Sequence, residues 1–184
     1  AAGEKGQVDG DSFTQTIKDM DMLVEYAKAT YNAEVTLLGH SYGSFLSQAY
    51  LEKYSNKLKG VVLSGTAYMK SPLLASGLVI ASMQNLLFGP DKPGKLIDKL
   101  SFGAYNKPFE SQGQKFAWLS RDPKQVEKYE KDPYCGYVMS IGFYRSFFKG
   151  IMGMYGEDAK NINKKLPILI AVGSDDPVSQ NASL

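Results

Sequence analysis

The sequence predicts an α/β fold, with a mainly parallel sheet flanked by helices, on three observations. Short, partly β-branched apolar segments lie at residues 34–38, 60–65 and 166–173, as expected of buried strands. Helical patterns separate these segments, which favours parallel pairing through right-handed crossovers. About a hundred residues lie between the second and third segments, whereas ordinary connections rarely exceed about 12–15 residues. We therefore expect an inserted structure there.

The composition is that of an ordinary globular domain. Of 184 residues, 43% are hydrophobic and 22% charged, and such a chain can bury a sizeable core. The net charge of +2, without a basic stripe, predicts no nucleic-acid partner. The single Cys135 and the lack of a leader-like start favour a reducing, cytoplasmic location. The apolar region 72–88 is interrupted by polar residues and is too short for a membrane span.

The first expected element is an amphipathic helix over residues 12–30. Ser12 and Gln15 form a capping-box pattern at its start. Apolar residues then recur at spacings of three and four, namely Phe13, Ile17, Met20, Val24 and Ala27. The strand over 34–38 follows, and a second helix runs from residue 44 to about residue 54.

The insertion has segments of different character. Residues 68–100 read as helical, 101–115 as loop and 123–131 as a charged stretch. The run 137–155 is helical and rich in aromatic residues and Met, and it is apolar on more than one face. It needs either core partners on several sides or an apolar ligand. The expected domains are core residues 1–66, a helical cap at 67–160 and core residues 161–184.

Residues 39–43 read Gly-His-Ser-Tyr-Gly and join the first strand to the second helix. A G-x-S-x-G pattern in this context is typical of a sharp turn that exposes a nucleophilic serine while glycines relieve crowding. An accidental glycine–serine turn is the alternative, but the flanking strand and helix favour the functional interpretation. Ser41 is therefore the candidate nucleophile.

A nucleophilic serine needs a base and a third group that orients the base. The turn 173–177 follows the third strand, at the carboxyl end of the sheet where Ser41 also lies. We prefer Asp176 as the acid and assign Asp175 to the turn or to solvent, and an ordinary turn role for both remains the alternative. The only histidine, His40, precedes the nucleophile, so we expect its side chain to point away into packing. The chain then lacks a base.

Several segments resemble bacterial α/β-hydrolases of the monoacylglycerol lipase and lysophospholipase-like group. The similar segments are 35–46, 50–54, 60–66, 118–122, 132–136 and 170–178. The resemblance implies the α/β-hydrolase fold with an inserted helical cap, with Asp176 as the catalytic acid and the backbone N–H of Tyr42 as half of an oxyanion hole. It also implies that the chain is an internal fragment, inactive alone because the catalytic histidine lies outside it.

The expected activity is that of a serine hydrolase that uses an acyl-enzyme and needs no metal or cofactor. The apolar cap favours esters of apolar acyl groups, such as monoacylglycerols or lysophospholipids, and peripheral contact with lipid surfaces. One alternative is a noncatalytic binding module for a hydrophobic ligand. Peptidase, thioesterase and peroxidase activities on the same fold also remain open.

Overall fold

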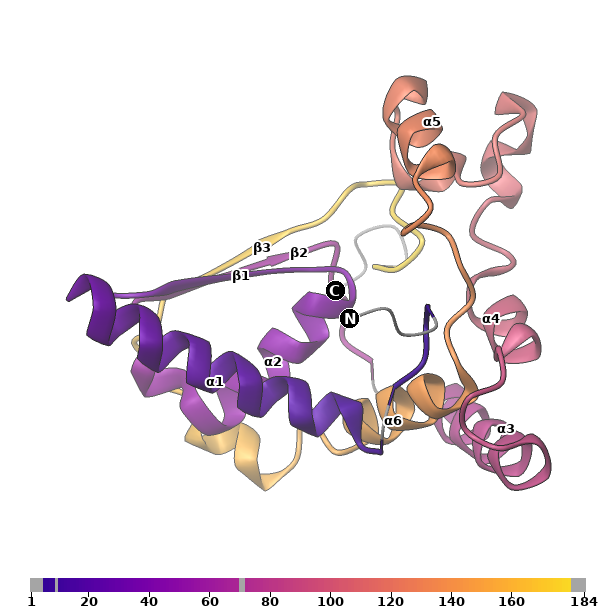
Figure 1. Ribbon diagram of the computed structural model, residues 1–184. Helices are drawn as coiled ribbons and strands as arrows, with labels where there is room; N and C mark the ends of the chain where they lie inside the picture. Colours follow the sequence, from indigo (N-terminus) through magenta and orange to yellow (C-terminus); the bar gives the residue numbers. More distant parts are fainter. Residues whose placement is uncertain (1–4, 9, 70–71, 180–184) are drawn as a thin grey trace. The chain divides into compact units, whose positions relative to one another are not determined.

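The computed structural model describes residues 5–8, 10–69 and 72–179 (Figure 1). The chain divides into two compact units, one of Ala1–Gly10 with Ser76–Arg145 and the other of Asp11–Ala75 with Ser146–Leu184. Two helices, α3 (Pro72–Phe88) and α6 (Ile141–Met152), begin in one unit and end in the other. The expected cap boundaries at residues 67 and 160 stay a prediction.

The second unit contains a parallel three-stranded sheet. Its strands are β1 (Thr36–His40), β2 (Gly60–Ser64) and β3 (Ile168–Ala171), in the order β1-β2-β3. The parallel α/β architecture predicted from the sequence is thereby confirmed. The register places Leu38 beside Val62 and Val62 beside Leu169. All three strands therefore end at the same edge of the sheet.

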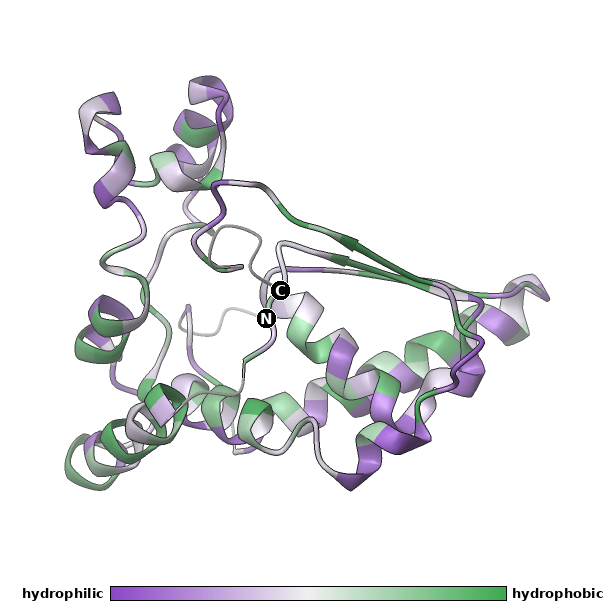
Figure 2. Ribbon diagram, turned by 180° about the vertical axis from the view of Figure 1, so that it is seen from behind, coloured by the Kyte–Doolittle hydropathy of each residue, from purple (hydrophilic) through white to green (hydrophobic). Residues whose placement is uncertain are grey.

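One face of this sheet is covered by helices of the same unit. The helix α2 (Tyr42–Tyr54) packs on the sheet, and α1 (Ser12–Tyr31) lies beside α2 on the same side (Figure 1). Val61 on this face is only 2% exposed. Leu38 and Leu169 on the opposite face are 66% and 60% exposed, and Figure 2 shows that the strands are largely hydrophobic. Parallel sheets are normally buried on both faces, so we expect further structure to pack against this exposed apolar face.

The start of α1 differs from the capping box that the sequence predicts. Asp11 is the N-cap, and its Oδ1 accepts a hydrogen bond from Thr14 N at 3.2 Å. Ser12 Oγ is buried without a hydrogen-bond partner within the described part of the chain. Ser146 Oγ on α6 donates to Asp11 Oδ1 at 3.0 Å and accepts from Phe13 N at 2.9 Å. Asp11 thus both caps α1 and joins it to α6.

The remaining elements are short helices. They are α4 (Lys95–Phe102), α5 (Pro123–Lys131), and the 3₁₀ helices η1 (Ser55–Lys57), η2 (Lys107–Gln112), η3 (Ala117–Leu119) and η4 (Glu157–Asn161). The stretch 101–115, expected as loop, therefore includes the end of α4 and all of η2. In the first unit, Tyr144 Oη donates to Asp98 Oδ1 at 2.7 Å and joins α6 to α4. None of the helices in residues 5–8, 10–69 and 72–179 is long and apolar enough to span a bilayer.

Candidate active site

Ser41 occupies a strained turn between β1 and α2. Its backbone has φ 51° and ψ −119°, and a positive φ with such a ψ is uncommon for a residue with a side chain. Hydrogen bonds hold it there, from Ser41 N to Ser64 O at 2.9 Å and from Ser44 N to Ser41 O at 2.8 Å. The Ser41 side chain makes no capping bond to α2. Strain of this kind is typical of a serine held at a nucleophile elbow.

The two glycines of the motif have different reasons to be glycine. A Cβ on Gly39 would lie 2.3 Å from Ser47 Oγ and 2.4 Å from Gly43 O, so no side chain fits there. Ser47 Oγ itself donates to Gly43 O at 2.8 Å, which fixes the crowding atoms. A Cβ on Gly43 would meet no atom of the described residues within 4 Å. The expected relief of crowding is therefore found at the first glycine only.

Tyr42 is the first residue of α2, and its side chain turns into an aromatic cluster. Its ring centroid lies 5.2 Å from that of Phe147 and 6.3 Å from that of Phe13. Burial and the nearby charge of Asp11 raise the pKa of Tyr42 to about 12, so the phenol is neutral at physiological pH. The backbone N–H of Tyr42 lies at the N-terminus of α2, and helix N-termini stabilise nearby negative charge. Its oxyanion role stays a prediction.

Asp176 follows β3 and reaches the end of the central strand. Its Oδ1 accepts from Val178 N at 2.9 Å, and its Oδ2 lies 3.6 Å from the place of a Cβ on Gly65, directly after β2. Ser41 follows the strand on the other side of β2. Asp176 is half-buried, whereas Asp175 is exposed. The structure thus brings the predicted nucleophile and acid to the same edge of the sheet, on either side of β2.

The expectation that His40 packs inside the protein is wrong. His40 is exposed, and its Nδ1 lies 3.1 Å from Ser64 Oγ, within hydrogen-bond distance. Side chains alternate between the two faces of a strand, so His40 shares the face of Leu38, which α2 does not cover. The ring lies near the same glycine as the acid, with Cε1 3.2 Å from the place of a Cβ on Gly65.

An apolar pocket of about 250 Å³ lies in the second unit. It is lined by Met69, Pro72, Leu74, Ile151, Met152, Met154 and Tyr155. The sequence predicts an apolar ligand or core partners for the run 137–155, which supplies four of these residues. The other wall, formed by Met69, Pro72 and Leu74, was not predicted from the sequence. Three apolar residues this soon after the β2 strand could have indicated it.

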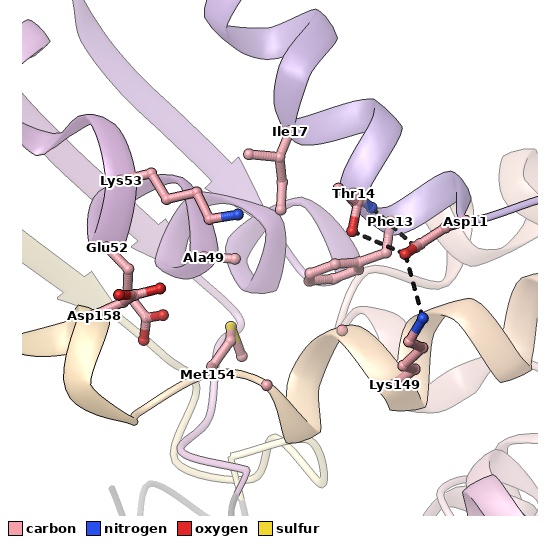
Figure 3. Close-up of a pocket in the computed structure, with 12 residues that line it drawn as sticks. Asp11, Phe13, Thr14, Ile17, Ala49, Glu52, Lys53, Lys149, Met154 and Asp158 are labelled. Atoms are coloured by element: carbon pink, nitrogen blue, oxygen red, sulfur yellow. Dashed lines mark hydrogen bonds and ion pairs between the residues drawn. The ribbon is translucent and has the colours of Figure 1, made fainter.

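A second pocket, of about 180 Å³, is lined by charged as well as apolar side chains (Figure 3). Lys149 Nζ lies 3.8 Å from Asp11 Oδ2 at one end. At the other end Glu52 and Asp158 lie close together beside Met154 (Figure 3). Neither pocket is lined by Ser41 or Asp176. Within the described residues no cluster of three or more His, Cys, Asp or Glu side chains is arranged to hold a metal ion.

Comparison with known proteins gives a family and a fold. The family described as serine aminopeptidase, S33, matches residues 1–184. No curated protein sequence matches significantly. A thermostable carboxyl esterase from Bacillus coagulans, solved in complex with glycerol, is 22% identical, with a TM-score of 0.81, over 93% of this chain and 56% of that one.

Two monoacylglycerol lipases are also similar. That of Paleococcus ferrophilus is 24% identical, with a TM-score of 0.59, over 94% of this chain and 57% of that one. A soluble variant of the Saccharomyces cerevisiae monoglyceride lipase, bound to a substrate analogue, is 18% identical, with a TM-score of 0.63, over 96% and 55%. These likenesses confirm the α/β-hydrolase fold. The chain spans little more than half the length of these solved structures.

Proposed function

This chain belongs to the serine aminopeptidase S33 family of hydrolases. On that premise, we propose that it is part of a serine hydrolase that cleaves carboxylic esters of apolar acyl groups. Monoacylglycerols and lysophospholipids are the substrate classes we infer. The observation that carries the proposal is the backbone of Ser41, strained at φ 51° in the turn between β1 and α2. A serine with positive φ at the carboxyl end of a parallel strand, directly before a helix, is the geometry a nucleophile elbow requires.

The proposed reaction passes through an acyl-enzyme. Ser41 Oγ attacks the ester carbonyl carbon while its proton moves to a histidine outside these residues, which Asp176 orients. Negative charge develops on the carbonyl oxygen, and the backbone N–H of Tyr42 donates to it. The alcohol leaves with the proton from the histidine, and water then hydrolyses the acyl-enzyme. The mechanism uses no metal or cofactor.

Support for an apolar acyl group comes from the pocket lined by Met69, Leu74 and Tyr155 among others. Methionine side chains adapt to flexible apolar ligands. The helix α3 contains no charged residue, and its Leu73 and Leu86 are 80% and 86% exposed. We propose that α3 makes peripheral contact with lipid surfaces, since large exposed apolar patches mark interaction sites. A cytoplasmic location, expected from the lone Cys135, stays part of this proposal.

The second candidate is a peptidase, favoured by the description of the family. The same serine would attack an amide carbonyl, with an amine rather than an alcohol as the leaving group. Esters of p-nitrophenol and p-nitroanilides of amino acids separate the two reactions. Turnover of fatty acyl esters without turnover of the anilides supports the esterase, whereas turnover of the anilides that is lost in Ser41→Ala favours the peptidase.

The nucleophile is tested in the complete protein with a fluorophosphonate probe. We expect Ser41→Ala to abolish labelling and to lower ester hydrolysis by about 10³-fold or more, because no other group supplies the nucleophile. Ser111→Ala is the matched control, because Ser111 is exposed and lies far along the chain in η2. Its labelling is expected to be unchanged. Labelling that persists in Ser41→Ala would overturn the assignment, and failure of the unmodified protein to react would favour a noncatalytic binding module.

A further inference from the structure

Two side chains on α2, Gln48 and Glu52, hold one residue that follows α6. Tyr155 Oη donates to Gln48 Oε1 at 2.6 Å, and Tyr155 N donates to Glu52 Oε1 at 2.7 Å. Glu52 is only 7% exposed, and a buried carboxylate needs such donors. These three residues, the α2 clamp, join the helix that follows Ser41 to the chain returning from α6.

The α2 clamp also holds the chain that leaves β2. Gln48 Nε2 donates to Thr66 Oγ1 at 2.8 Å and to Ala67 O at 3.2 Å. The ring of Tyr155 lies 4.6 Å from that of Tyr68. Burial raises the pKa of Tyr155, although a bond with the backbone of Met69 partly opposes this. The phenol is therefore protonated at neutral pH and can act as the hydrogen-bond donor to Gln48.

Tyr155 is held in a conformation that it would not adopt freely. Its φ is 63°, in the left-handed region that favours glycine, and such residues persist where their surroundings fix them. Gln48 and Glu52 fix Tyr155 by accepting hydrogen bonds from its hydroxyl and its N–H, respectively. Tyr155 and Met69 line the apolar pocket from opposite segments of the chain. The α2 clamp therefore sets the relative position of two pocket walls.

We propose that Gln48 and Tyr155 are positioning residues that shape the apolar pocket and so determine which acyl chain lengths the enzyme accepts. This inference rests on the proposed function, in which that pocket takes the acyl chain. Tyr155 lines that pocket and Gln48 does not, and neither side chain is assigned contact with the ester group that reacts at Ser41. Loosening the α2 clamp is therefore expected to weaken binding of long acyl chains and to leave the chemistry at Ser41 unchanged.

The experiment compares Tyr155→Phe and Gln48→Ala in the complete protein. Tyr155→Phe keeps the ring and loses one hydrogen bond. The loss of one such bond corresponds to about a fivefold change in binding affinity. We expect KM for p-nitrophenyl decanoate to rise about fivefold in Tyr155→Phe and at least as much in Gln48→Ala, which loses three hydrogen bonds. The kcat and KM for p-nitrophenyl acetate, and the rate of fluorophosphonate labelling, are expected to stay within about twofold. Tyr26→Phe, at an exposed tyrosine of α1, is the control and is expected to change none of these.

The double variant gives a second measurement. Because both substitutions break the same bond, their effects on KM for the decanoate are expected to be less than additive. An equal loss of kcat on both esters, or an unchanged KM for the decanoate, would overturn the inference. If Tyr155→Phe does not fold, Gln48→Met, similar in size to Gln but without its hydrogen bonds, undergoes the same test. Failure of the unmodified protein to react with the probe would overturn the proposed function and this inference together.

Discussion

At the residue scale, His40 presents the sharpest question, because it is the only histidine in the chain and directly precedes Ser41, the proposed nucleophile. Its ring is exposed, with Nδ1 within hydrogen-bond distance of Ser64 Oγ. That interaction is one that an amide side chain can also make. It directs His40 toward β2, the strand between Ser41 and Asp176. This contact with Ser64 favours a role for His40 in supporting the turn at Ser41 over a role as the catalytic base.

His40→Gln tests this role. We expect ester hydrolysis and fluorophosphonate labelling to stay within about threefold of the unmodified protein, because Gln can keep the bond to Ser64. Loss of a catalytic base would instead lower kcat by about 10⁴-fold or more. The measurement is kcat/KM against pH together with the labelling rate. A loss of that size, without loss of folding by circular dichroism, would make His40 the base.

The residues of the candidate site were predictable to different degrees. Ser41 and Asp176 stand in short motifs after strands, so local sequence is enough to propose them and to place them at the same edge of the sheet. Gln48 and Tyr155 are separated by 107 positions, and no local pattern connects them. The available signal was weaker: two polar residues, Gln48 and Glu52, one helical turn apart in a helix that is mostly buried. Buried polar groups need partners, but the sequence does not say which.

At the scale of elements, long periodic segments were predicted well and short ones poorly. The expected helix 12–30 corresponds to α1 (Ser12–Tyr31), because its buried residues recur at helical spacing. The 3₁₀ helices η2 and η3 have six and three residues, too few for periodicity to appear. Helix starts are also ambiguous where two capping residues are adjacent. The sequence prediction named Ser12 alone, but Asp is an equally good capping residue, and the hydrogen bond from Ser146 favours Asp11.

The cap of α1 gives a stability prediction. We expect Asp11→Ala to lower the free energy of unfolding by about 1 kcal/mol, because the bond from Thr14 N is lost. Asp11→Asn keeps an equally good cap without the charge, so it is expected to cost less at neutral pH. The measurement is urea unfolding of the complete protein. Equal stability of the alanine and aspartate forms would contradict the capping role.

The same aspartate makes stability depend on pH. Burial alone would raise the pKa of Asp11, but hydrogen bonds from Thr14 and Ser146 and the charge of Lys149 lower it below its ordinary value of 3.8. A lowered folded-state pKa means that the unfolded chain binds more protons in acid. The stabilisation from the Asp11 carboxylate is therefore complete above about pH 4 to 5. It is lost as the pH falls through the pKa of Asp11 in the folded protein. Asp11→Asn is expected to remove this part of the acid sensitivity.

At the scale of the whole molecule, the two compact units differ in what they expose. The unit with the sheet exposes apolar strand residues, such as Leu38 and Leu169, on the face that α2 does not cover. The other unit exposes most of α3, where Val79, Leu86 and Leu87 are 57%, 86% and 69% exposed. Composition alone predicted neither surface, because it does not say which apolar residues find partners. An apolar helix without charges is costly to leave in water and suited to a lipid surface.

The lipid contact is tested by Leu86→Gln/Leu87→Gln, which leaves Ser41 and the apolar pocket intact. Each leucine that enters a bilayer interface contributes about 1 to 2 kcal/mol, so we expect vesicle binding to weaken by about tenfold or more. Sedimentation with phosphatidylcholine vesicles measures binding, and a water-soluble short-chain ester measures the chemistry, which is expected to stay unchanged. Tyr134→Gln/Tyr137→Gln is the control, because these exposed apolar residues lie in the same unit outside α3. Equal binding by the two double variants would show that α3 is not the lipid contact.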